Sequence, residues 1–176
     1  MKPVFYDADV LSCFLAIHDV SILKDLFDKI VVPYDVFNEL KRASFLVNDL
    51  LDLINEGFIE VCDYTANRKM ENFISSLSHG YLLDKCIGRG EASAIALTVE
   101  YNGILASNNT KDLIEAIKKF NIKRIKTGDI LVKALDVGII TEDEGNDLWD
   151  KMLAKNRYLT ADSFSDYLND NQDVLF

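Results

Sequence analysis

The stretch VFYDADVL, residues 4–11, joins a short apolar run to two closely spaced acids. Residues 4–6 are apolar enough for a buried strand, Asp7 and Asp9 follow directly, and a helical apolar pattern starts at Val10. Ligands of an open α/β sheet bind at the carboxyl ends of its parallel strands, so an acid at this point is placed for chemistry. The alternative is that Asp7 only caps the following helix.

Four more segments have the length and apolar character of strands, and helical patterns separate them. These segments are residues 30–32, 58–62, 103–106 and 122–125. Strands that alternate with helices favour an α/β domain with a mostly parallel sheet.

The chain from residue 127 onward reads as helical. A capping box at residues 141–144 marks one helix start. Because no linker composition, repeat or low-complexity tract appears, we predict a single domain over 1–176. It would consist of an α/β core over 1–126 and a helical C-terminal extension, a hairpin, over 127–176.

Length and composition fit a compact protein of the cytoplasm. The 176 residues are 49% hydrophobic and include only two prolines, which favours a sizeable core over disorder. Cys13, Cys62 and Cys86 are odd in number and lack CxxC spacing, so we predict buried thiols in a reducing compartment. No signal stretch or long apolar run is present, which predicts a cytoplasmic protein without a membrane partner.

The net charge of −10 excludes one class of nucleic-acid-binding protein. A sequence-independent coat protein must neutralise phosphates and should be basic. An acidic protein can still act on nucleic acid where its acids surround metal ions, which invert the local electrostatics. Residues 118–126 carry five basic side chains, which fit a solvated charged face or a guide for a phosphate backbone.

Two later acids occupy positions comparable to that of Asp7. Glu39 shares a helix face with apolar Val36 and Ala43, and an inward carboxylate is unfavourable unless it is paired or metal-bound. A salt bridge to a neighbouring basic residue is the alternative. Glu91 follows two glycines at a predicted helix N-terminus, where the helix dipole favours an anion. A simple capping role is the alternative for Glu91.

The strand at 103–106 is followed by a third polar cluster, SNNTKD, at residues 107–112. It contains Ser107, Asn108, Asn109 and the acid Asp112. Polar side chains therefore gather again at the carboxyl end of a predicted strand, which is where ligands of such sheets bind.

Taken together, these stretches resemble the PIN-domain nucleases. DADVL at 7–11 looks like the opening motif of that family, and VPYDVFNEL at 32–40 resembles its second motif. GEASAIA at 90–96 and GDIL at 128–131 are similar to one prokaryotic branch, whose members include toxins and predicted nucleic-acid-binding proteins. The resemblance covers nearly the whole chain. It implies a PIN-like three-layer α/β/α fold with a mostly parallel central sheet and a C-terminal helical hairpin.

The fourth motif departs from one pattern of the family. Where that branch commonly has two aspartates, this chain has Asn108 and Asn109. The pattern of VapC-type toxins fits residues 107–112 better, with Asp112 as the acid.

The resemblance implies a metal-dependent endoribonuclease that uses Mg²⁺ or Mn²⁺, and possible membership of a toxin–antitoxin pair. Asp7, Glu39 and Glu91 would bind metal directly or through water, and Asp112 would bind metal or orient the attacking water. All four are therefore the predicted catalytic and metal-binding residues, since carboxylate oxygens are the ligands these ions prefer.

The same prediction assigns a second set of residues to substrate binding: Ser107, Asn108, Asn109 and Arg89. Asn109 and Ser107 could bond the phosphate or fix Asp7. The implied partners are an RNA substrate, an antitoxin protein and a second copy of the chain in a homodimer.

Two alternatives stay open at this point. A catalytically impaired PIN-like binding module would fit the two asparagines and the acidic charge. A haloacid-dehalogenase-type phosphatase would use Asp7 and Asp9 as nucleophile and acid and Asp129 as a magnesium ligand. Only about twenty residues separate Asn109 from Asp129, which is short for the βα units that this second fold needs.

Overall fold

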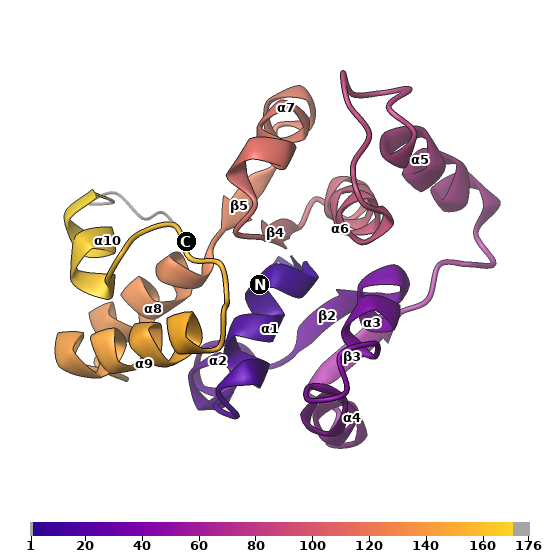
Figure 1. Cartoon of the computed structure of the whole chain (residues 1–176). Coiled ribbons are helices and arrows are strands. Elements are labelled where there is room, and N and C mark those ends of the chain that lie inside the picture. The colour runs from indigo at the N-terminus through magenta and orange to yellow at the C-terminus, as the bar shows by residue number, and fades with distance from the viewer. Residues whose placement is uncertain (1, 171–176) are drawn as a thin grey trace.

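The computed structural model describes residues 2–170 and contains one five-stranded sheet, all parallel, with the order β3-β2-β1-β4-β5 (Figure 1). The strands are β1 (Val4–Tyr6), β2 (Ile30–Pro33), β3 (Ile59–Cys62), β4 (Ile104–Ala106) and β5 (Lys123–Ile125). All five correspond to segments that the sequence pattern predicts as strands. The opening stretch of the chain thus becomes the central strand.

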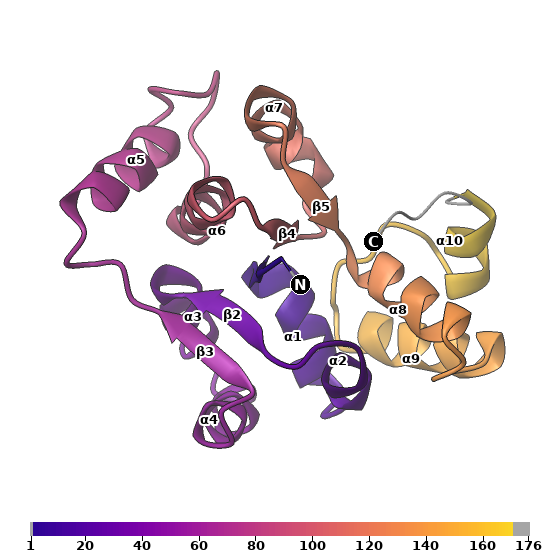
Figure 2. The ribbon, with the colours of Figure 1, turned by 180° about the vertical axis from the view of Figure 1, so that it is seen from behind.

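Helices cover both faces of the sheet (Figures 1 and 2). They are α1 (Ala8–Ala16), α2 (Ser21–Leu26), α3 (Tyr34–Leu40), α4 (Val47–Asn55), α5 (Arg68–Ser78), α6 (Arg89–Glu100), α7 (Thr110–Phe120), α8 (Thr127–Asp136), α9 (Glu142–Ala154) and α10 (Phe164–Asp170). Side chains of a strand alternate between its faces. Val4 and Tyr6 accordingly join a core with α1, α2 and the C-terminal helices, whereas Phe5 joins a second core with α5, α6 and α7. The predicted three-layer α/β/α class is confirmed.

The register of the sheet brings two polar strand ends to the same level. Tyr6 of β1 pairs with Ala106 of β4, so Asp7 and Ser107 leave neighbouring strands side by side. The Asp7 amide donates to the Ala106 carbonyl at 2.9 Å, and the Ser107 amide donates to the Ile125 carbonyl at 3.0 Å. Both residues are therefore held by the sheet and not by a free loop.

The C-terminal helices pack around one buried tryptophan. The Trp149 ring lies 6.1 Å from Phe164 and 5.5 Å from Tyr167, measured between centroids, and its indole N–H donates to the Ala161 carbonyl at 3.2 Å. A Cβ at Gly145 would lie 2.3 Å from the Phe164 ring, so only glycine fits there. The extension predicted over 127–176 is helical in α8, α9 and α10.

The predicted domain over 1–176 also includes Met1 and residues 171–176, which lie outside the described residues. Within residues 2–170, no helix has the length and apolar character needed to cross a membrane. The cysteine prediction is wrong in one respect, because Cys86 is exposed and Cys62 is only partly buried; Cys13 is buried, and all three thiols are free.

Candidate active site at the carboxyl end of the central strands

Asp7 is buried where the two central strands end. Its side chain is 4% exposed, and its two oxygens have different partners. Oδ1 accepts a hydrogen bond from the Ala8 amide at 2.8 Å, and Oδ2 accepts one from the Ser107 hydroxyl at 3.0 Å. Asp7 thus caps α1 and also joins a second strand end. Burial raises its pKa well above the usual range, and the negative charges of Asp9 and Glu91 raise it further.

Asp9 lies beside Asp7 and belongs to the same cluster, although the nuclease site predicted from the sequence does not include it. Its Oδ2 accepts from the Asn108 amide at 2.8 Å and from the Ser107 hydroxyl at 3.3 Å. Its Oδ1 is buried and has no hydrogen-bond partner among residues 2–170. Burial raises the pKa of Asp9 to about 6. In the sequence, the feature that could have indicated a site role for Asp9 is its position two residues after Asp7.

Glu91 is placed at the start of α6 and faces the same region. Oε2 accepts from the Gly88 amide at 3.2 Å, which is the capping contact, while Oε1 accepts from the Asn109 side-chain amide at 2.5 Å. One oxygen of Glu91 therefore caps α6, and the other is hydrogen-bonded to Asn109, which follows β4. Its charge raises the pKa of both Asp7 and Glu39, so the three carboxylates act on one another.

Glu39 reaches this cluster from α3 because a glycine faces it. A Cβ at Gly90 would lie 2.8 Å from Glu39 Oε2. The Glu39 side chain is half-buried, and burial followed by the charge of Glu91 raises its pKa. The salt bridge considered as the alternative is not found among the described residues.

Asp112 lies at the rim of the cluster. Its side chain is 49% exposed, and it forms an ion pair with Lys85. Asn109 donates to Asp112 Oδ2 at 2.8 Å as well as to Glu91, so one amide group connects the two acids. The hydrogen bonds from Lys85 and Asn109 lower the pKa of Asp112. Asp112 is therefore linked to the buried acids through Asn109.

The chain as a whole matches a known family. A family model described as PIN domain matches residues 3–172. The chain belongs to the PIN-domain family. PIN domains are generally nucleases. In this PIN domain Asp7 directly follows β1, Glu39 and Glu91 lie on α3 and α6, and Asp112 lies on α7 after β4. A search of curated proteins found no match to the chain.

The family assignment overturns the phosphatase alternative. In that alternative Asp129 would be a magnesium ligand. In this PIN domain Asp129 accepts from the Lys126 amide at 2.8 Å, which caps α8, and from the Tyr167 hydroxyl of α10. Asp129 therefore contributes to the packing of α8 against α10.

Two of the predicted substrate contacts are buried in this PIN domain. Asn108 is 1% exposed; its amide donates to Thr127 Oγ1 at 3.0 Å and to the Tyr158 carbonyl at 3.1 Å, and its oxygen accepts from the Thr127 amide. Ser107 is fully buried against Asp7 and Asp9. Their side chains thus contact the acids and the chain around them, and the bond from Ser107 to Asp7 is the second of the two contacts that the sequence suggests for Ser107. Substrate binding by either residue stays a prediction.

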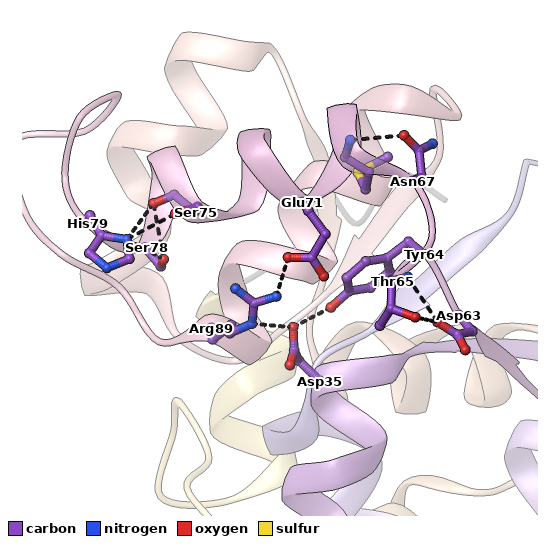
Figure 3. A network of polar contacts seen from close by, with 11 residues as sticks. Asp35, Asp63, Tyr64, Thr65, Asn67, Glu71, Ser75, Ser78, His79 and Arg89 are labelled. Atoms are coloured by element: carbon purple, nitrogen blue, oxygen red, sulfur yellow. Dashed lines mark hydrogen bonds and ion pairs between the residues drawn. The ribbon is translucent and has the colours of Figure 1, made fainter.

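Arg89 is also engaged within the protein. Its Nε lies 3.0 Å from Asp35 Oδ2, and its Nη2 lies 2.6 Å from Glu71 Oε2. Figure 3 shows the guanidinium between these two carboxylates, with the Tyr64 hydroxyl on Asp35. This side chain therefore joins α3, α5 and α6, and substrate binding by Arg89 stays a prediction. Asn109 is the remaining predicted contact, and its amide is directed at Glu91 and Asp112.

The chemistry of the acidic cluster fits a divalent cation. Among residues 2–170, no group of three or more His, Cys, Asp or Glu side chains is arranged as a metal shell. The donors are nevertheless carboxylate oxygens, which Mg²⁺ and Mn²⁺ prefer, and one of them, Asp9 Oδ1, is buried without a partner. A cation beside Asp7 and Glu39, whose pKa values burial and the charge of Glu91 raise, would stabilise their ionised forms.

Replacing Gly90 by alanine is expected to lower nuclease activity without loss of stability. The added Cβ displaces the Glu39 carboxylate, which is the flexible end of its side chain, and its next neighbours are Val36 Cγ2 at 3.5 Å and Val36 Cα at 4.0 Å. A displacement of about 1 Å in a catalytic group lowers activity by about a hundredfold. Activity and melting temperature should be measured together, with Glu100→Ala, an exposed position on the same helix, as a control. Wild-type activity in Gly90→Ala would show that activity does not depend on the position of the Glu39 carboxylate.

Proposed function

We propose that this PIN domain is a metal-dependent endoribonuclease that hydrolyses phosphodiester bonds of RNA. The observation that carries the proposal is the cluster of Asp7, Asp9, Glu39 and Glu91, with an unpartnered carboxylate oxygen inside it. Such a concentration of buried negative charge opposes folding unless a cation or proton neutralises it. Retaining it makes physical sense where a metal is used.

Asp7, Glu39 and Glu91 would hold Mg²⁺ or Mn²⁺, and the free oxygen of Asp9 adds a donor next to them. A bound metal in such a site supplies a hydroxide-like nucleophile and stabilises negative charge on the scissile phosphate. RNA as the substrate rests on the resemblance of residues 107–112 to the VapC-type pattern.

The other residues of the site have positioning roles in this proposal. Ser107 donates to Asp7 and Asp9 and so fixes the direction of both carboxylates. Asn109 holds Glu91 and Asp112 at a set separation, because a single amide group donates to both. Asp112 would orient the attacking water at the rim. The Asn109 amide thus stands between charges that would otherwise repel each other.

The experiment is cleavage of an end-labelled RNA of mixed sequence by the full chain with Mn²⁺, Mg²⁺ or EDTA. We expect cleavage with either metal and none with EDTA, and a DNA of matched sequence tests the choice of RNA. Binding of Mn²⁺ to the native state must also raise the melting temperature. A folded protein that gains stability from Mn²⁺ but cleaves neither RNA nor DNA would contradict the proposal.

A folded protein that neither cleaves RNA nor gains stability from Mn²⁺ would instead favour the non-catalytic PIN-like module, for which Asn108 and Asn109 and the charge of −10 are the supporting features. Thermal shift separates the two functions further, because a module without a metal site gains no stability from Mn²⁺. A toxin role, an antitoxin partner and a homodimer stay predictions from the family resemblance.

A further inference from the structure

A hollow of 340 Å³ lies beside the acidic cluster and is closed on one side by the C-terminal extension. Asp9, Ser12 and Glu39 line it from α1 and α3, and Arg157 and Tyr158 line it from the segment between α9 and α10. Its volume lies within the range of small-ligand sites, about 300–1,000 Å³. The extension therefore contributes to the surroundings of the candidate active site.

We infer that this hollow seats one nucleotide of single-stranded RNA, with Arg157 binding a backbone phosphate and Tyr158 stacking on the base. The inference rests on the proposed function, because it identifies the part of the substrate next to the reacting bond. It goes beyond that function by assigning substrate binding to a segment about 150 residues away from Asp7 in sequence.

Arg157 carries a positive charge that no carboxylate neutralises among residues 2–170. Its Nε donates to the Lys155 carbonyl at 3.1 Å, its Nη1 lies 3.4 Å from Ser12 Oγ, and the guanidinium lies 5.8 Å from the centre of the Phe45 ring. Arg89, in contrast, is bound by two acids. In so acidic a chain, an unneutralised guanidinium beside a cluster of carboxylates suits an anionic ligand, and its planar fork matches a phosphate.

Aromatic surface lies next to that charge. Tyr158 is 63% exposed and Phe45 is 54% exposed, although both are large side chains. Bases of single-stranded nucleic acid stack on aromatic rings, and this contact tolerates any base because every base has a π-face. A phosphate bound by Arg157 and a base stacked on Tyr158 would belong to the same nucleotide.

The backbone that carries these two side chains is held in place relative to the acids. The Asn108 amide at the end of β4 donates to the Tyr158 carbonyl at 3.1 Å, and the backbone amide of Asn108 donates to Asp9 at 2.8 Å. The Arg157 amide donates to the Met152 carbonyl at 3.1 Å. One buried asparagine thus connects the catalytic strand end to the segment that carries Arg157 and Tyr158.

The test measures RNA binding apart from cleavage. The parent is Asp7→Asn, which keeps the RNA intact, and the probe is a fluorescein-labelled single-stranded RNA of about ten nucleotides followed by anisotropy. Adding Arg157→Ala or Tyr158→Ala should weaken binding about tenfold each. Arg157→Ala should also reduce the salt dependence by about 0.7 in the log–log slope, the value for one lost phosphate contact on a single strand.

Conservative and distant variants serve as controls. Arg157→Lys should keep the salt slope while losing part of the affinity, and Tyr158→Phe should bind as the parent does, because it keeps the ring. Lys155→Ala removes a neighbouring charge and Tyr81→Ala removes another exposed tyrosine, and both should leave affinity within about twofold of the parent. Melting temperatures identify any variant that fails to fold.

Each result supports or overturns the inference separately from the nuclease activity. If Arg157→Ala and Tyr158→Ala bind like the parent, or if the parent binds no RNA, the inference is wrong even when the wild type cleaves RNA. If binding depends on both residues but the wild type cleaves nothing, the nucleotide site stands and the proposed nuclease function fails. In the wild-type background, a raised KM for both variants would agree with the binding data.

Discussion

Asp7→Asn is expected to abolish RNA cleavage and at the same time to stabilise the metal-free protein. Asp7 is the most deeply buried acid of the cluster, and its charge is what a divalent cation would neutralise. Removing one charged group that stabilises a transition state lowers kcat by about a hundred- to a thousandfold. The asparagine is close in shape and can still accept from the Ala8 amide, so α1 keeps its cap.

The stability gain follows from the direction of the pKa shifts. Burial and neighbouring charges raise the pKa of Asp7, and burial raises that of Asp9 to about 6. The folded state therefore binds protons that the unfolded state releases, and the stability of the metal-free wild type falls as pH rises from about 4 through the raised pKa values. A neutral residue at position 7 removes the larger part of this fall in stability with rising pH.

Thermal unfolding in EDTA at about pH 5 and about pH 8 measures this effect. The wild type should be less stable at the higher pH, and Asp7→Asn should show a smaller difference. For a chain of this size, each kcal/mol corresponds to about 2–4 °C in melting temperature. Mn²⁺ should stabilise the wild type more than the variant. Asp28→Asn, an exposed acid, is the matched control and should change neither activity nor pH dependence. A variant that cleaves RNA normally would exclude Asp7 from catalysis.

Trp149→Ala is expected to give the largest loss of stability. Trp149 is fully buried, its ring packs on Phe164 and Tyr167, and its N–H reaches the Ala161 carbonyl. Truncating a buried aromatic residue to alanine lowers the free energy of unfolding by about 3–5 kcal/mol, since a cavity is left and contacts are lost. Urea denaturation measures the change in midpoint at constant m-value.

Trp149→Phe is the control, because it keeps an aromatic ring and should lose less than the alanine variant. Packing of α9 against α10 holds the ends of the segment that carries Arg157 and Tyr158. Trp149→Ala should therefore also weaken RNA binding at temperatures where most of the protein is folded. A loss below about 1 kcal/mol would show that the C-terminal helices do not unfold cooperatively with the sheet.

The secondary structure and the family could be predicted from the sequence because their signals are local. An apolar run that ends in Asp7, and Pro33 at a strand–helix junction, each identify an element from its neighbours in sequence. Local signals also selected Glu39, from its helix face, and Glu91, from a predicted helix N-terminus after two glycines. Parallel strands expose their carboxyl ends together, so the strand assignments brought Asp7 and residues 107–112 to one edge of the sheet.

The roles of individual polar side chains were decided only by the tertiary structure. Asn108 and Arg89 have residue types that suit substrate binding, yet their partners are Thr127 and the acids Asp35 and Glu71. Nothing near them in sequence indicates those contacts.

The same holds for the two features that add most to the site. Asp9 is distinguished by one buried oxygen without a partner, and Arg157 by its place beside acids from the start of the chain. The sequence by itself determined the layers and the strand ends, since backbone pattern is a property of neighbouring residues. The tertiary structure alone determined which side chains are neutralised and which are free, because charges and hydrogen bonds pair by distance in space.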